Sequence, residues 1–515
     1  GKRSDEYKIW HKPKMESLNK ANRGSISTGY DIDNSIMFST SGTYADSNSY
    51  TYHLMNPGGD DNWSATSTNG TNARKVTVSL WFKRTLTTES GHYPRLFDYR
   101  AGGVAFSVYL NTSDQLQMYD DNTSMSLKSN QVFRDVSAWY HMVFAIDQTQ
   151  STGSNRVKVY VNGEQITSWA TEDYGNQNVD LSCFRADSVN FYIGGAANDA
   201  GAYFNGYITE YHFIDGQQLA QTEFGEFSDD GIWIPKQFTG SYGILGHYYN
   251  FSNSSDMGED FSGNNNDANN RGSGIANGSA RQSTDTPTNN FCTLNSLNTA
   301  SNGGGNVEYS DGATKGKTLQ TDEPASGTMA VTKGKWYFEC KAVSNSDMMA
   351  GYGVPNKWGN HTNNPGYDVY SFAVHSVGRV YYYGNTFIDL SPSVSYDTND
   401  IISVALDADN GFCYFAKNGT YMNGGSPTSG STGTGGFNYL SGSTGANMEI
   451  VDGDFLIPAF RTNYYTNSSV LVNFGGYTTI SISSGASDGN GYGTFEYAPP
   501  SGYYSLCTKN LAEYG

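Results

Sequence analysis

The feature of this 515-residue sequence that most restricts its fold is a hairpin pattern that occurs twice. An apolar strand pattern ends on an aspartate at Val143–Asp147, and the next strand pattern ends on Asn162-Gly163. The same order recurs in Val404–Asp407 and Phe412–Gly419. Asparagine followed by glycine favours a tight hairpin turn whose two central residues both have positive φ. The repeat therefore predicts two related units of antiparallel strands, and it indicates two jelly-roll architectures.

Strand patterns of this kind fill two blocks of the sequence. The first block extends from Val76–Phe82 to Tyr207–Ile214, and the second extends from Lys335–Ala342 to Val470–Phe474. Short, closely spaced strands are typical of β-sandwiches rather than of alternating strands and helices. One stretch, Gly216–Phe224, has the character of one or two helical turns. We therefore expect an all-β protein with two antiparallel β-sandwich (jelly-roll) domains in tandem.

Changes in composition along the chain predict the domain boundaries. Residues 1–28 are expected to be a basic N-terminal arm, residues 29–242 the first sandwich, and residues 305–515 the second. Residues 243–304 lie between the sandwiches and become rich in Gly and Asn, which is typical of a connecting segment and linker.

The overall composition excludes several classes of protein. Charged residues make up 16% of the chain and aromatic residues 14%, whereas disordered chains are rich in charge and poor in aromatics. The net charge of −19 argues against a nucleic-acid partner, because phosphate binding needs a basic face. No run of apolar residues approaches about 18 in length, so no membrane insertion is expected.

The N-terminal arm differs in charge from the rest of the chain. Residues 1–23 carry a net charge of +4, whereas the remainder carries −23. Such an arm is either a solvated tail or a segment that docks on a partner subunit. The apolar pair Ile9-Trp10 would be costly to expose on a free tail, so we predict that it contacts a neighbouring chain.

Five cysteines are widely spaced and form no C-x-x-C pattern: Cys183, Cys292, Cys340, Cys413 and Cys507. Their odd number and their spacing favour neither a disulfide framework nor a zinc site. Buried, reduced thiols are expected.

Each block resembles a known family of β-sandwich modules. Residues ~30–225 resemble laminin-G-like, concanavalin A-type lectin/glucanase modules, and residues ~305–507 resemble a SPRY-like domain. The first resemblance is carried by Val78–Phe82, Trp139–Asp147, Val159–Gly163, Tyr192–Gly195 and Phe204–Glu210. The second is carried by Gly334–Glu339, Asp400–Asp407, Phe415–Gly419 and Leu456–Phe460.

Two further segments are similar to parts of virion proteins of tailed bacteriophages, notably marine ones. These segments are the joint Thr286–Phe291 and the ending Pro499–Asn510. In those proteins a laminin-G-like module leads into a SPRY-like module, and the resemblance covers about four fifths of this chain. It implies a structural or adhesion role without shared catalytic residues.

Glycoside hydrolases also occur among concanavalin-type sandwiches, so paired carboxylates must be considered. Such enzymes place their acids on one strand in an E-x-D-x-x-E pattern. The corresponding strand here offers only Glu210 and Asp215, which lie five residues apart and on opposite faces of a regular strand. A G-x-S-x-G match at Gly485–Gly489 lacks the helix that a nucleophile elbow needs. We therefore predict that the protein is not an enzyme.

The stretch Asp256–Asp267 is rich in the oxygen ligands that calcium prefers. Its candidate ligands are Asp260, Asn264, Asn266 and Asp267. A similar turn in concanavalin-type modules can be purely structural, so a structural turn and a calcium site both stay open. No other cofactor is expected.

Aromatic residues in polar loops are the candidates for glycan binding, because sugar C–H faces stack on rings while amides bind the hydroxyls. Trp358 lies in a loop without apolar periodicity, beside Asn360, His361 and Asn363, and Trp63 lies in a second polar loop.

Together these features predict a structural or adhesion protein on the surface of a tailed-phage virion, as a fibre, tail appendage or capsid decoration. Its expected partners are other virion proteins, further copies of itself and host cell-surface glycans. The alternatives are a glycoside hydrolase or depolymerase of the concanavalin-like fold, and a secreted bacterial lectin or adhesin.

Overall fold

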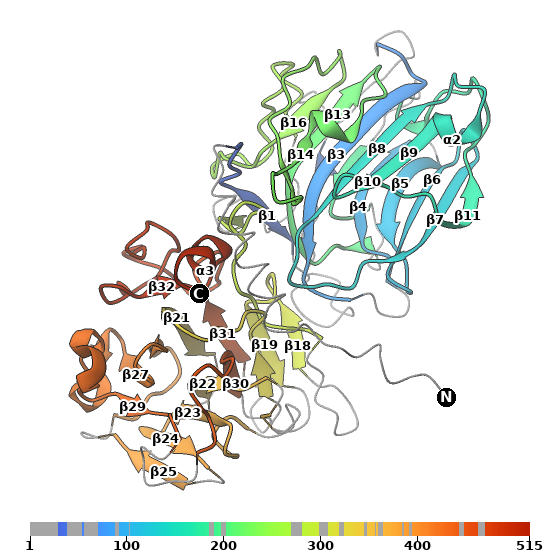
Figure 1. Cartoon of the computed structure of the whole chain (residues 1–515). Helices are drawn as coiled ribbons and strands as arrows, with labels where there is room; N and C mark the ends of the chain where they lie inside the picture. The colour runs from blue at the N-terminus through green and yellow to red at the C-terminus, as the bar shows by residue number, and fades with distance from the viewer. Residues whose placement is uncertain are drawn as a thin grey trace, which may run out of the picture.

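The computed structural model contains two β-sandwiches in tandem, each with its own hydrophobic core (Figure 1). It describes residues 29–38, 54–55, 71–87, 92–101, 103–184, 190–196, 202–268, 281–297, 307–318, 324–343, 348–355, 357–358, 364–383, 386–390, 394–441, 448–461 and 469–515. The α-helices among these residues are the short α2 (Gly153–Arg156) and α3 (Thr508–Tyr514). Gly216–Phe224 contributes only a 3-10 turn at Gln221–Glu223. The predicted all-β fold with two antiparallel sandwiches is confirmed.

In the first module, the described residues form two large sheets that share one core. One sheet has the order β10 (Glu164–Gln165), β9 (Val157–Val161), β8 (Tyr140–Asp147), β3 (Lys75–Arg84), β13 (Gly206–Asp215), β1 (Ser35–Phe38) and β17 (Gln282–Ser283), with β16 (His247–Tyr249) paired to β13. The other has the order β11 (Trp169–Asp173), β7 (Met125–Val132), β6 (Gln115–Asp120), β5 (Val104–Leu110), β4 (Arg95–Ala101), β12 (Asn190–Ile193) and β2 (Leu54–Met55). A separate hairpin pairs β14 (Gly225–Phe227) with β15 (Trp233–Pro235). Alternate residues of β3, from Val76 to Phe82, are completely buried in this core.

The second module is also a two-sheet sandwich. One sheet has the order β18 (Val307–Ser310), β19 (Lys315–Thr318), β31 (Ser469–Asn473), β21 (Lys335–Ala342), β26 (Ile401–Asp407), β27 (Phe412–Lys417) and β28 (Thr420–Tyr421), with β29 (Phe437–Asn438) on β27 and β32 (Tyr504–Ser505) on β21. The other has the order β20 (Pro324–Ser326), β30 (Ile457–Arg461), β22 (Met349–Gly353), β23 (Ser371–His375), β24 (Arg379–Tyr382) and β25 (Thr386–Asp389). Its core includes Phe338, Phe372, Val404 and Phe460.

Both predicted hairpin turns are present and have the same geometry. The Asn162-Gly163 turn has φ values of 47° and 85°, and the Asn418-Gly419 turn has values of 47° and 79°. In each turn the asparagine Oδ1 accepts a backbone N–H, from His141 at 2.8 Å in the first module and from Ile401 at 2.9 Å in the second. The repeated sequence pattern therefore encodes a repeated structural unit.

The unit also includes a lysine on the neighbouring strand. Lys75 of β3 lies opposite Asp147 of β8, and its Nζ is 3.1 Å from Asp147 Oδ2. Lys335 of β21 lies opposite Asp407 of β26 in the same way, at 2.7 Å. Each aspartate also accepts N–H groups from the turn that follows it, including those of Thr149 and of Asn410. The same lysine–aspartate ion pair therefore joins equivalent strands in both sandwiches.

Residues 243–304, which the sequence places in a connecting segment, contribute to the first sandwich. β16 pairs with β13, β17 pairs with β1, and Tyr249 and Phe251 are buried in the first core. Phe291 forms a bridge with Cys507 of the second module. The boundary at residue 242 is therefore too early, because the apolar residues beyond it complete the first core.

Asp285 holds the segment that leads from the first module into the second. Its carboxylate accepts hydrogen bonds from Lys83 Nζ at 2.8 Å and from Trp139 Nε1 at 3.0 Å, both in the first module. Lys83 also donates to Asn290 Oδ1 and to the carbonyl of Phe291, and the Lys83 side chain is completely buried. We refer to this ion pair and its partners as the Lys83–Asp285 clasp.

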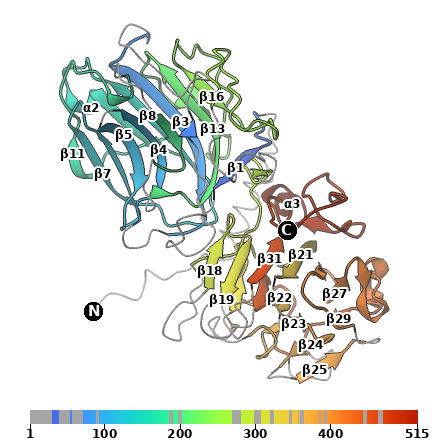
Figure 2. The ribbon, with the colours of Figure 1, turned by 180° about the vertical axis from the view of Figure 1, so that it is seen from behind.

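Further contacts surround the clasp. The Tyr207 hydroxyl of β13 donates to the carbonyl of Gly312 in the second module at 2.8 Å. Lys509 of α3 pairs with Asp31 near the start of the first module at 3.2 Å. Both views show α3 at the junction (Figures 1 and 2). The modules therefore meet through buried and hydrogen-bonded groups.

All five cysteines are free and buried, as the sequence predicts. Burial raises the pKa of the Cys507 thiol to about 11 and that of Cys413 further, so both remain protonated at neutral pH. No helix in the described part of the chain has the length and apolar character needed to cross a bilayer.

Candidate functional site

Trp358 is not a surface residue. Its side chain has no exposed area, and a Cβ atom placed on Gly353 would lie 2.7 Å from its ring. The ring therefore fills the space above a glycine of β22, which a polar local sequence does not reveal. The prediction that Trp358 stacks on a sugar is wrong for this reason. Its predicted companions Asn360, His361 and Asn363 lie outside the described residues.

Three other predicted residues also lie outside the described part of the chain: Trp63, the second glycan candidate, and the Ile9-Trp10 pair of the arm. Their roles stay predictions.

The residues proposed for calcium form a hydrogen-bonded turn. The Asp260 carboxylate accepts the backbone N–H groups of Tyr248, Ser262 and Asn266 and also the Ser262 hydroxyl. Asp267 Oδ1 accepts the N–H of Asp260, and the side-chain amides of Asn264 and Asn266 both donate to the carbonyl of Gly246. Each of these side chains therefore has hydrogen-bond partners within the protein, as a structural turn requires, and calcium binding stays a prediction.

The two acids considered for hydrolysis are held in separate networks. A bulge between Thr209 and His212 interrupts β13, and Glu210 has a φ of 50° there. The Glu210 carboxylate accepts the hydroxyls of Tyr30 at 3.0 Å and Tyr248 at 2.7 Å. Burial and the nearby Glu210 carboxylate raise the pKa of both tyrosines, so they stay hydrogen-bond donors.

Asp215, at the end of β13, has a structural role. It accepts the backbone N–H groups of Thr71 at 2.8 Å and Leu245 at 3.2 Å. Among the described residues, no three His, Cys, Asp or Glu side chains group as a metal site.

A surface that the sequence did not single out carries the exposed ring of Phe387 beside half-buried and buried aromatic rings. It is the outer face of β23, β24 and β25, which we call the tip face and define by Tyr367, His375, Arg379, Tyr381, Phe387 and Asp389. Val380 and Tyr382 of β24 point into the core, so Arg379 and Tyr381 point outward. Tyr381 pairs with Phe387 of β25, whose side chain is 40% exposed.

The tip-face residues contact one another in a row across the three strands. The ring centroids of His375 and Tyr381 lie 5.2 Å apart, and those of Tyr381 and Phe387 lie 5.6 Å apart. The Arg379 guanidinium lies 4.0 Å from the Phe387 centroid, and its Nε donates to Asp389 Oδ1 at 2.7 Å. The hydrogen bond to Asp389 raises the pKa of Arg379. The face therefore presents rings beside a fixed cation and a carboxylate.

The tip face lies at the end of the second module that is farthest from the first module, as both views of the molecule show (Figures 1 and 2). Val377 and Tyr383, in the turns that flank β24, are 44% and 37% exposed. The sequence contained a signal for this face, because Arg379–Tyr382 alternates between core residues and outward-pointing ones. Only the strand pairing brings the outward-pointing rings together.

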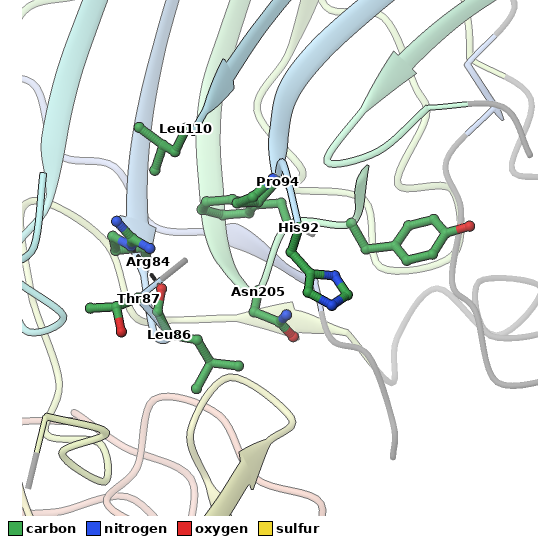
Figure 3. Close-up of a pocket in the computed structure, with 9 residues that line it drawn as sticks. Arg84, Leu86, Thr87, His92, Pro94, Leu110 and Asn205 are labelled. Atoms are coloured by element: carbon green, nitrogen blue, oxygen red, sulfur yellow. Dashed lines mark hydrogen bonds between the residues drawn. The ribbon is translucent and has the colours of Figure 1, made fainter. Parts of the chain in front are cut away.

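The first module carries a small pocket. Figure 3 shows the polar side chains of Arg84, His92 and Asn205 around it, together with Leu110. Its volume of about 10 Å³ corresponds to about one water molecule. It is too small to hold a ligand.

The fold describes a protein that carries two β-sandwich modules in tandem. Comparison with known families agrees: residues 57–223 match the concanavalin A-like lectin/glucanases superfamily, and residues 335–435 match the SPRY domain. The chain therefore carries a concanavalin A-like module and a SPRY module in tandem, as the sequence resemblance implies. These module types indicate a β-sandwich protein of the carbohydrate-binding or adhesion type.

Similar solved structures include two SPRY-type domains and a pentraxin. The TRIM65 PSpry domain is 14% identical and covers 35% of this chain and 91% of its own, with a TM-score of 0.26. The SPRY domain of human HERC1 is 18% identical, covers 31% and 86%, and has a TM-score of 0.22. A heptameric SAP-like pentraxin from Limulus polyphemus is 14% identical, covers 37% and 80%, and has a TM-score of 0.23. Such scores are too low to support a functional argument. No curated protein matches the sequence.

Proposed function

We propose that this protein is a non-catalytic adhesion protein that binds surface glycans through its tip face. The observation that carries the proposal is the exposed ring of Phe387 packed on the half-buried Tyr381, with Arg379 and Asp389 beside it. Sugar rings offer apolar C–H faces that pack on aromatic rings, and their hydroxyls take hydrogen bonds from charged side chains. A salt bridge keeps Arg379 in place, so little side-chain freedom is lost on binding.

Two observations favour binding over hydrolysis. Glu210 is enclosed by two tyrosine hydroxyls, and Asp215 is occupied by backbone N–H groups. Retaining and inverting glycosidases both need two carboxyl groups that face the same bond. These two acids do not meet that requirement. Depolymerase activity is the alternative function, and release of oligosaccharide from envelope polysaccharide would support it.

We further propose that the protein is displayed on the surface of a tailed-phage virion, with other virion proteins and copies of itself as partners. Support comes from the resemblance of Thr286–Phe291 and Pro499–Asn510 to phage virion proteins, and from the basic arm on an acidic chain. A secreted bacterial lectin is the alternative. Finding the protein in purified particles by mass spectrometry, and losing it from them when residues 1–23 are deleted, would support the virion proposal. Normal incorporation of the truncated chain into particles would refute the proposed docking role of the arm.

Replacement of Phe387 tests the glycan proposal on the full chain. Phe387→Ala removes an exposed stacking ring and is expected to weaken binding to extracted host envelope polysaccharide about tenfold, because a hot-spot aromatic contributes roughly 1–2 kcal/mol. Phe261→Ala is the matched control, since Phe261 is also 40% exposed but lies in the first module. Equal binding by both variants and the unchanged protein would refute the proposed site.

A further inference from the structure

A second site, separate from the tip face, lies between the two modules. A cleft of about 610 Å³ opens where β17 of the first module meets the loop that follows β31 of the second. This volume falls within the range of roughly 300–1,000 Å³ that is typical of small-molecule sites, and such sites occur preferentially at domain interfaces.

The described lining of the cleft carries hydroxyl and amide groups but no charged side chain. One wall consists of Gln282, Ser283 and Thr284, and the other includes Tyr477, Thr478, Thr479 and Thr494. Thr284, Thr479 and Thr494 are exposed at the surface. A hydroxyl both donates and accepts hydrogen bonds, so this lining is complementary to a neutral ligand that carries many hydroxyls.

The floor of the cleft is fixed by contacts between the modules. The carbonyl of Gly476 accepts the Thr284 N–H at 3.0 Å and the Ser283 hydroxyl at 3.1 Å. The neighbouring Gly475 has a φ of 110°, and a Cβ atom there would lie 2.7 Å from the Cα of Gly493. Close backbone packing and cross-module hydrogen bonds thus hold both walls in place before a ligand arrives.

The cleft also offers apolar surface. The ring of Tyr477 packs edge-on against Tyr207 of the first module, with centroids 6.5 Å apart, and Ile480 and Ile482 lie beside it. Burial raises the pKa of Tyr477, so its hydroxyl stays protonated. A sugar needs this combination of apolar contact for its C–H groups and neutral partners for its hydroxyls.

We propose that the inter-module cleft binds a neutral, polyhydroxylated ligand of the size of a short oligosaccharide. This inference goes beyond the tip face, because the two sites share no residue. Neither module alone could form this site, since each supplies only one wall of the cleft. The proposal therefore gives the junction between the modules a role in binding.

The test is calorimetric titration of the full chain with neutral trisaccharides of glucose, mannose and galactose, and with trigalacturonate as the charged comparison. At least one neutral sugar is expected to bind, with little dependence on salt, and to protect residues 475–482 from hydrogen exchange. The double variant Thr479→Val, Thr494→Val keeps the side-chain shape and should weaken this binding about tenfold. Thr171→Val, an exposed threonine on β11, is the control and should change nothing.

Phe387→Ala separates this inference from the proposed function. It should leave binding in the cleft unchanged while it weakens polysaccharide binding at the tip face. Failure of all three neutral sugars to bind, equal binding by the double variant, or preference for trigalacturonate would overturn the inference.

Discussion

At the scale of single residues, burial determines what an aromatic side chain can do. Trp358 is completely buried over Gly353, so Trp358→Ala should leave a cavity and lower the free energy of unfolding by about 3–5 kcal/mol. Trp358→Phe, which retains a ring, should cost less. Denaturant titration gives these values, and glycan binding of the folded fraction should not change. A drop in binding at unchanged stability would restore Trp358 as a ligand contact.

Burial also determines the charge of His141. Its ring stacks on Trp81, its Nδ1 accepts the Trp233 indole N–H at 2.9 Å, and its Nε2 lies 2.9 Å from Ser79 Oγ. Burial is the main cause and the nearby His212 the lesser cause that lower the pKa of His141 to about 3. The unfolded chain takes up this proton near pH 6.5, so stability is complete above that pH and falls as the pH drops toward 3.

We therefore expect His141 to cost about 2 kcal/mol of stability between pH 7 and pH 5. His141→Gln, which cannot take up a proton, should reduce the pH dependence by that amount in urea titrations at the two pH values. His247 also has a pKa lowered by burial, to about 4, and its contribution should remain in the variant. An identical loss in variant and unchanged protein would show that His141 does not titrate as described.

At the scale of elements, the two hairpin turns depend on glycine for two reasons. Gly163 has a φ of 85°, and a Cβ atom there would lie 2.3 Å from the Trp233 ring. Gly419 has a φ of 79°, and its Cβ would lie 2.6 Å from Tyr497. Backbone strain and overpacking each cost roughly 1–3 kcal/mol, so either Gly→Ala change should destabilise its module by more than about 2 kcal/mol.

Gly231 provides the control for these turns. Its φ is 76° and no atom lies near its Cβ position, so Gly231→Ala isolates the backbone strain. Thermal unfolding of the three variants should rank Gly231→Ala as the mildest. If all three variants lower the melting temperature equally, overpacking against Trp233 and Tyr497 does not contribute to the loss of stability.

Local patterns predicted the strands and the Asn-Gly turns, because those depend on neighbouring residues. The lysines opposite Asp147 and Asp407 could not be predicted, since strand pairing across about 70 residues brings each pair together. The tip face depends on nearer pairs, such as Tyr381 with Phe387, but the strand register that aligns these rings was not predicted. Trp358 was misjudged because its polar neighbours in sequence do not show that the ring folds back over Gly353, five residues earlier.

At the scale of the whole molecule, we expect the Lys83–Asp285 clasp to couple the two modules, because it fixes to the first module a segment whose Asn290 carbonyl accepts the Thr508 N–H of the second at 2.9 Å. Asp285→Ala would leave the Lys83 ammonium completely buried without its counter-charge, which costs about 3–5 kcal/mol. Asp31→Ala is the control, because the Asp31–Lys509 pair also joins the modules but is partly exposed and should contribute less than about 1 kcal/mol.

Calorimetry distinguishes these outcomes. Asp285→Ala should separate the unfolding of the two modules into distinct transitions, whereas Asp31→Ala should not. Adding Lys83→Met to Asp285→Ala should recover part of the loss, because the unpaired charge is then removed. Unchanged unfolding of the Asp285→Ala variant would mean that the clasp does not couple the modules.

Hydrogen exchange of the full chain, with and without extracted host envelope polysaccharide, tests whether the outer face of β23–β25 binds glycan. The ligand should slow exchange in residues 379–389, and Phe387→Ala should abolish this protection. Protection confined to the first module, with exchange in residues 379–389 unchanged by a polysaccharide that does bind, would contradict this proposal.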